Sequence, residues 1–114
     1  MARKAAPVVD EILKAIAGIQ EALAGKTFAD FEQEWLLNHG VQRGIEIISE
    51  ATRHLPGELK ATRPEIRWTS IAGIGNVLRH DYYAISNEII WKVIREDLPP
   101  LKAAIEWIAA NLKE

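Results

Sequence analysis

Apolar side chains recur every three or four residues along most of this chain, which is the spacing of helices that each bury one face. The first segment with this pattern predicts a helix from about Pro7 to Ala24, because proline is tolerated in a first helical turn and Gly25 follows as a stop. Its predicted buried stripe consists of Ile12, Ile16, Ile19 and Leu23.

The second periodic segment predicts a helix that continues to Leu55 before the turn at Pro56-Gly57. Thr27 followed three residues later by Asp30 is typical of a helix start, and we expect a bend or break at Asn38-His39-Gly40. The predicted inner face is Val41, Ile45, Ile48, Thr52 and Leu55. A polar stripe at helical spacing contains His39, Arg43, Glu46, Glu50 and His54. Its simplest interpretation is a solvated face with ion pairs, whose histidines are exposed or capping residues.

The third helical pattern follows a predicted loop at residues 56–64. It starts near Glu65 or Trp68 and ends between His80 and Tyr83. The polar residues at its end make it the main candidate for a functional site.

The last segments predict a helix that Ser86 caps and that runs from Asn87 to about Asp97. Pro99-Pro100 must then kink or restart the chain into a helix ending at Leu112. Both share an apolar seam of Ile90, Ile94, Leu98, Leu101, Ile105, Ile108 and Leu112. No strand, repeat or low-complexity tract stands out, so the pattern predicts an all-α antiparallel bundle of four to five helices.

Composition narrows the class of protein. With 114 residues, 48% of them hydrophobic and 26% charged, we expect one globular domain over residues 1–114. The 14 Lys and Arg against 16 Asp and Glu give a net charge of -2. The chain therefore has no overall basic field, so we expect no DNA binding, and any RNA contact must be local.

The absence of cysteine excludes disulfides and thiolate metal sites and fits a reducing cytoplasm. The basic residues Arg3 and Lys4 are not followed by the apolar run of a secretory signal, and no stretch is long enough to span a membrane. We therefore expect a cytoplasmic protein without a membrane partner.

The residues best suited to chemistry lie between Ile71 and Tyr83. A helical wheel places Ile71, Ile74, Gly75, Leu78 and Tyr82 on one face and Gly73, Asn76, Val77 and His80 on the other. We expect this helix to be buried on more than one side, with a neighbouring backbone close to Gly73. Asn76 lies one turn before His80, near enough to hydrogen-bond its ring or a shared ligand. His80 would then lie in a narrow, partly dry crevice, and the alternative is a satisfied core histidine.

The remaining motifs limit the chemistry. Four tryptophans, interpreted as core and interface anchors rather than a platform for bases, are Trp35, Trp68, Trp91 and Trp107. The sequence contains no phosphate-binding glycine loop, HExxH, nucleophile elbow or helix-turn-helix, so we expect neither a metal nor a cofactor. A lone histidine with arginine, asparagine and tyrosine can still transfer protons and stabilise a phosphate when the substrate supplies its own nucleophile, as RNA does through its 2′-hydroxyl.

Four stretches of the chain fit one known pattern. They are Gly44–Ala51, Pro64–Trp68, Gly75–Tyr82 and Trp91–Pro99. In combination they resemble the HepT family of the HEPN (higher eukaryotes and prokaryotes nucleotide-binding) superfamily, and the resemblance covers nearly the whole chain. It implies a small HEPN-like helical protein, usually a homodimer, that is encoded beside a minimal nucleotidyltransferase antitoxin. The resemblance also implies a toxin that acts as a metal-independent endoribonuclease.

The resemblance assigns roles to individual residues. His80 matches the family's catalytic histidine, and Asn76 matches the polar residue that follows its arginine. Tyr82 matches a tyrosine that receives AMP from the partner in relatives, although it could simply pack as an aromatic on the Leu78 face. Gly75 stands where the family's arginine is expected.

The missing arginine leaves the cation of the site open. A guanidinium binds a phosphate with two parallel hydrogen bonds, and losing such a contact commonly costs ~10²-fold in rate. Arg79 is the candidate replacement, the alternative being a solvent-facing charge near a helix end. Arg43 or Arg67 could contribute from elsewhere in a dimer.

Two hypotheses of different class follow. In the first, the chain is a ribonuclease toxin in which His80 is the general acid or base and Arg79 with Asn76 binds the phosphate. In the second, it is a non-catalytic dimeric module that docks the nucleotidyltransferase, its active motif weakened at Gly75. A nucleotide-binding regulator is a third possibility that no residue specifically supports.

Overall fold

The computed structural model describes residues 4–80 and 86–113. Four helices of 13 residues or more occur in this part of the chain: α1 (Ala5–Leu23), α3 (Trp35–Arg53), α5 (Trp68–His80) and α7 (Leu98–Ala110). Shorter elements are α2 (Phe28–Gln33), α4 (Gly57–Ala61), α6 (Asn87–Lys92) and the π-helical η2 (Val93–Asp97). The predicted all-α fold is confirmed, with no strand among the described residues.

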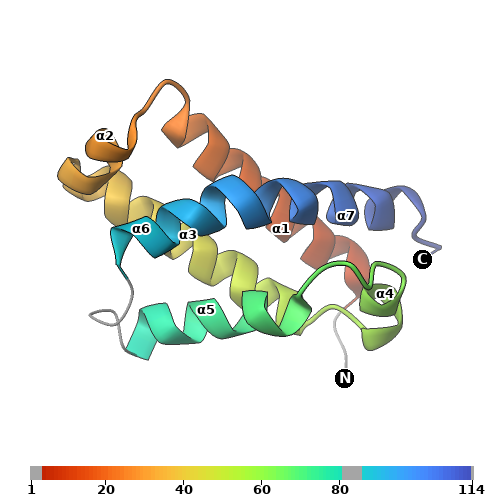
Figure 1. The fold of residues 1–114 in the computed structure, drawn as a ribbon. Coiled ribbons are helices and arrows are strands. Elements are labelled where there is room, and N and C mark those ends of the chain that lie inside the picture. The colour runs from red at the N-terminus through yellow and green to blue at the C-terminus, as the bar shows by residue number, and fades with distance from the viewer. Residues whose placement is uncertain (1–3, 81–85, 114) are drawn as a thin grey trace.

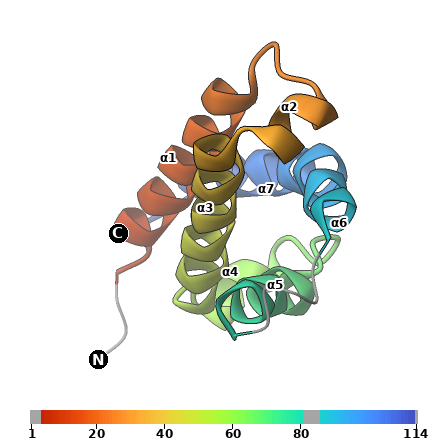
Figure 2. The same ribbon diagram turned by 90° about the vertical axis from the view of Figure 1, so that its left-hand side faces the viewer.

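The helix α3 is the central element of the fold. It packs against α1 and against α5, and α1 also packs against α7 (Figures 1 and 2). The core between them is aliphatic. The predicted inner face is buried at Val41, Ile45, Ile48 and Thr52 of α3 and at Leu55, which lies just beyond the end of α3 at Arg53. In α1 the predicted stripe is buried at its three isoleucines, and Leu23 packs at the edge of the core. None of the helices in residues 4–80 and 86–113 is long and apolar enough to cross a bilayer.

The start of the second helical segment is confirmed, but its predicted break is wrong. The Asp30 amide donates to the Thr27 hydroxyl at 3.1 Å, and the Thr27 amide donates to the Asp30 carboxylate at 2.9 Å. These hydrogen bonds hold the pKa of Asp30 below its usual value. The helix then breaks at Glu34, whose backbone is extended, and continues unbroken through residues 38–40.

Asn38 explains why the break does not fall where we expected it. Its side chain is buried and donates to the Phe31 carbonyl at 3.1 Å and to Asn87 at 2.9 Å, while it accepts a hydrogen bond from Gln42. An asparagine whose side chain is fully occupied by tertiary partners no longer competes for its own helix backbone. Asn38 therefore ties α2, α3 and α6 together instead of ending a helix.

The predicted loop at residues 56–64 contains the short helix α4, so that prediction is wrong in part. The indole nitrogen of Trp68 donates to the carbonyls of Lys60 and Arg63, both at 3.1 Å. These bonds fix the connection against the first turn of α5, which begins at Trp68 and not at Glu65.

The last helical segments follow the prediction with one addition. Ser86 caps α6 by accepting from the Ile89 amide at 3.3 Å. The chain then widens into η2 before α7 begins at Leu98 with proline in its first turn. Pro99 and Pro100 have no amide hydrogen to donate to the preceding turn, which accounts for a restart here.

The tryptophans divide into two groups. Trp68 and Trp91 pack against the core, and the Trp91 ring contacts Phe31 with centroids 5.5 Å apart. Trp35 and Trp107 are 66% and 43% exposed, so they are not core residues of the single chain, and their alternative role as interface anchors stays a prediction. Trp35 instead stacks on His39, with ring centroids 4.2 Å apart.

Candidate functional site

Gly75 sets the distance between α5 and α3. The Ser49 hydroxyl donates to the Ala72 carbonyl at 2.7 Å and accepts from the Gly75 amide at 3.2 Å. A β-carbon built on Gly75 would overlap the Ser49 side chain, whereas one built on Gly73 meets nothing within 4 Å. The predicted close approach at Gly73 is therefore wrong, and it occurs at Gly75. An arginine side chain has no room at position 75 unless α3 moves.

The exposed face of α5 carries the predicted catalytic residues. Gly75 and Leu78 are the buried residues of this helix, and Asn76, Arg79 and His80 are all exposed. His80 is the last residue of α5, and its side chain makes no hydrogen bond or ion pair to another described residue. In the single chain it lies neither in a dry crevice nor in the core, so both expectations for its burial are wrong. Its ring is accessible to a substrate.

Arg79 and Asn76 contact each other on this face. A terminal nitrogen of the Arg79 guanidinium lies 3.5 Å from the Asn76 amide oxygen, one turn earlier in α5. The other terminal nitrogen lies 3.7 Å from a carboxylate oxygen of Glu50 on α3. The two predicted phosphate-binding residues thus contact each other near the end of α5, where His80 also lies.

Glu50 is at the centre of a group of charged residues that we name the Glu50 cluster: Glu50, Arg53, His54 and Arg79. Glu50 lies 3.8 Å from Arg53 and 3.4 Å from the His54 ring. Arg53 also donates to the Ala72 carbonyl at 2.9 Å, which joins the cluster to α5. The predicted ion pairs of the polar stripe are confirmed, including Arg43 with Glu46 at 3.4 Å. The link from Glu50 to α5 was not foreseen, since no local signal in the sequence gives the register of two helices.

Arg67 lies at the other end of α5 from His80. A helix rises by ~1.5 Å per residue, so the span from Trp68 to His80 is about 18 Å. Arg67 forms an ion pair with Asp97 at 3.2 Å. Within one chain the structure therefore brings Arg79 and Asn76 to the His80 end, and it does not bring Arg67 there.

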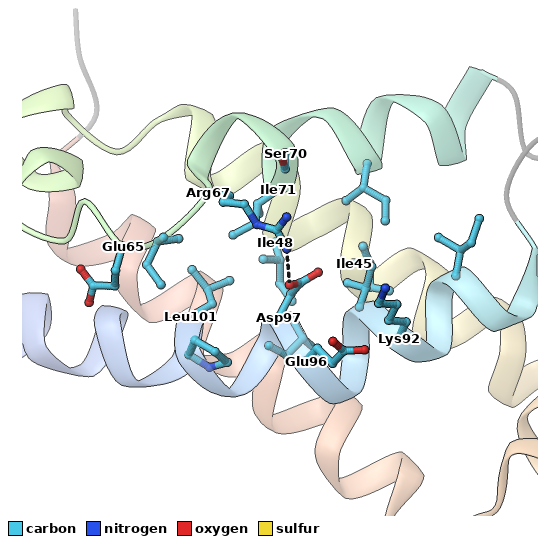
Figure 3. A pocket seen from close by; sticks show the side chains of 16 residues that line it. Ile45, Ile48, Glu65, Arg67, Ser70, Ile71, Lys92, Glu96, Asp97 and Leu101 are labelled. Atoms are coloured by element: carbon cyan, nitrogen blue, oxygen red, sulfur yellow. Dashed lines mark hydrogen bonds and ion pairs between the residues drawn. The ribbon is translucent and has the colours of Figure 1, made fainter.

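A cavity of about 500 Å³ lies on the other side of α5 (Figure 3). Its lining is mainly aliphatic and includes Ile45 and Ile48 of α3, Ile71 and Ile74 of α5, and Leu101 of α7. Arg67 and Asp97 both line it and form the ion pair that the dashed line in Figure 3 marks. Asn76, Arg79 and His80 do not line it, so the apolar cavity and the polar site are separate features.

Tyr82, predicted to accept AMP, lies outside the described residues. Within residues 4–80 and 86–113 no group of three or more His, Asp or Glu side chains is arranged to hold a metal ion. The groups assembled on α5 are an imidazole, a guanidinium and an amide. This set can transfer a proton and bind a phosphate.

Comparison with known proteins now adds the family. A model of the family described as Ribonuclease HepT-like matches residues 12–108, which include every described residue of the candidate site. The chain belongs to the HepT-like ribonuclease family. The resemblance inferred from the sequence motifs is thereby confirmed.

Two curated relatives illustrate the extent of the match to HepT-like proteins. "Probable ribonuclease HepT" from Thermococcus cleftensis is 33% identical over 106 residues, covering 93% of this chain and 96% of that protein. "Putative RNase TTE0752" from Caldanaerobacter subterraneus subsp. tengcongensis is 31% identical over 107 residues, covering 94% of this chain and 96% of the relative. No solved structure matches the chain.

Proposed function

We propose that this HepT-like chain is a metal-independent endoribonuclease and the toxin of a toxin–antitoxin pair. The observation that carries the proposal is the joint position of Arg79 and Asn76, 3.5 Å apart on the exposed end of α5 that also carries His80. Relatives over nearly the full chain length are named as ribonucleases, which supports RNA as the substrate. The low net charge of -2 fits a short, local RNA contact rather than a long basic track.

The chemistry that fits these groups uses the RNA's own 2′-hydroxyl as the nucleophile. A base removes the 2′-hydroxyl proton while the 2′-oxygen forms a bond to phosphorus, and the bond from phosphorus to the 5′-oxygen breaks. An acid gives a proton to that 5′-oxygen, leaving a 2′,3′-cyclic phosphate and a 5′-hydroxyl end. His80 serves as acid or base, and Arg79 with Asn76 stabilises the charge on the phosphate.

We propose a homodimer as the active form. A single histidine acts as either the acid or the base at a given moment. Two copies of α5 that face each other supply one histidine for each role. The exposure of His80 and Asn76 in the single chain supports such a cleft between copies. The expected partner in the pair is a minimal nucleotidyltransferase, with Tyr82 as the residue that accepts AMP.

The test compares His80→Ala with His39→Ala. We expect His80→Ala to lose RNA cleavage by 10²-fold or more, and to lose growth inhibition, because a general acid or base contributes about 10²–10⁴-fold. Since the His80 side chain is exposed and makes no hydrogen bond or ion pair to another described residue, helicity and melting temperature should change little. His39 is an exposed histidine of α3 that hydrogen-bonds the Trp35 carbonyl, and removing it should leave cleavage intact. Equal activity of wild type and His80→Ala would contradict the proposed role.

A second candidate function is a non-catalytic module that docks the nucleotidyltransferase. Two observations favour it: Gly75 replaces the family's arginine at a position without space for a side chain, and Glu50 already engages Arg79. It predicts a stable complex with the nucleotidyltransferase that His80→Ala does not weaken, and no ribonuclease activity once the partner is removed. A His80-dependent cleavage of RNA decides against it.

A further inference from the structure

The Arg79 side chain is the least exposed of the three arginines that the sequence offers for phosphate binding. Its side chain is 38% exposed, against 67% for Arg43 and 77% for Arg67. The difference arises because Arg79 leans toward α3, where Glu50 receives one end of the guanidinium and Asn76 the other. Arg79 is therefore held from two helices at once.

Glu50 is itself held in place. Arg53 and His54, three and four residues later in α3, lie 3.8 and 3.4 Å from its carboxylate. Arg53 in turn donates to the Ala72 carbonyl of α5. The carboxylate thus connects both helices through several partners, and its position does not depend on Arg79 alone.

We propose that Glu50 is a positioning residue that orders the Arg79 guanidinium beside Asn76 for the phosphate. This inference rests on the proposed ribonuclease function. A free arginine side chain loses rotational freedom when it binds, and ordering it beforehand reduces that entropic penalty at the transition state. The glycine at position 75 makes this ordering necessary, because the cation must reach the phosphate from position 79.

Removing the charge of Glu50 should affect RNA binding and turnover in different ways. The cluster carries two arginines and one carboxylate, so replacing Glu50 with glutamine raises its positive charge by one. RNA is a polyanion, and a more positive surface binds it at least as well. A positioning role therefore predicts that turnover falls while KM for RNA does not rise.

The experiment measures kcat and KM for RNA cleavage by wild type, Glu50→Gln, Glu50→Asp and Glu58→Gln. Glu58 is an exposed carboxylate of α4 with no ion pair to another described residue, so Glu58→Gln removes the same charge away from Arg79. We expect Glu50→Gln to lower kcat about 10-fold without raising KM, Glu50→Asp to fall between, and Glu58→Gln to match wild type. A kcat of Glu50→Gln equal to that of wild type would overturn the proposal.

A second measurement keeps this inference separate from the ribonuclease proposal. NMR relaxation of the Arg79 side-chain Nε–H group reports its mobility in protein without RNA. We expect restricted motion in wild type and in Glu58→Gln, and averaged motion in Glu50→Gln. Unchanged Arg79 relaxation in Glu50→Gln overturns the positioning role, whether or not the wild-type protein cleaves RNA. Absence of cleavage by wild type is a failure of the proposed function alone.

Discussion

At the scale of single residues, Gly75 and Gly73 differ in the space around them, although they lie only two positions apart in α5. Gly75 lies against Ser49 of α3, and a β-carbon built on Gly73 would meet nothing within 4 Å. From the sequence we expected the close approach at Gly73, and it occurs at Gly75. That distinction depends on the register between α3 and α5, which non-local packing sets.

The two glycines give a matched pair of substitutions. We expect Gly75→Ala to lower the free energy of unfolding by about 1–3 kcal/mol, because overpacking at Ser49 has no room to relax. Gly73→Ala should raise it by up to about 1 kcal/mol, since alanine favours a helix more than glycine does. Denaturant titrations of both variants make the comparison, and equal effects would contradict the close contact at Gly75.

At the scale of elements, the sequence predicted where helices start more accurately than where they break. Thr27 with Asp30 and Ser86 cap α2 and α6 as predicted, because capping uses only neighbours in the chain. The predicted break at Asn38 failed, because this side chain finds partners in α2 and α6 that local propensity does not include. Of the two predicted starts of α5, the structure has Trp68, whose indole bonds to the preceding connection.

The capping box of α2 predicts a dependence of stability on acid. The pKa of Asp30 is lowered in the folded protein, from an ordinary value of 3.8, by its hydrogen bonds with Thr27. A lowered pKa means that the folded state favours the ionised carboxylate. The contribution of Asp30 is therefore complete above pH 3.8 and is lost as the pH falls through the lower folded value.

Thermal melts between about pH 6 and pH 2 would measure this contribution. We expect Asp30→Asn to lose less stability than wild type over the acid part of that range. Glu32→Gln is the matched control, since the Glu32 side chain is exposed on the same helix and makes no hydrogen bond or ion pair to another described residue. If the melting temperatures of wild type and Asp30→Asn fell equally as the pH decreased, the capping carboxylate would not contribute to stability.

At the scale of the whole molecule, α5 packs closely on α3 and carries a different feature on each side. The aliphatic cavity that Arg67 borders lies toward α6, η2 and α7, and the Glu50 cluster lies at the exposed edge with α3. The sequence motif identified the His80 end of α5 as the candidate site and gave the family. It did not reveal the Glu50 contact with Arg79, because that contact depends on how α3 and α5 pack.

The central claim is that Arg79 acts with His80 at the end of α5, in place of an arginine at position 75. Single-turnover RNA cleavage in the presence of EDTA, by wild type, Arg79→Ala and Arg67→Ala, tests it most directly. We expect wild type to leave 2′,3′-cyclic phosphate ends, Arg79→Ala to be slower by 10²-fold or more, and Arg67→Ala to change by less than about threefold. No cleavage by wild type, or an Arg79→Ala rate equal to that of wild type, would contradict the claim.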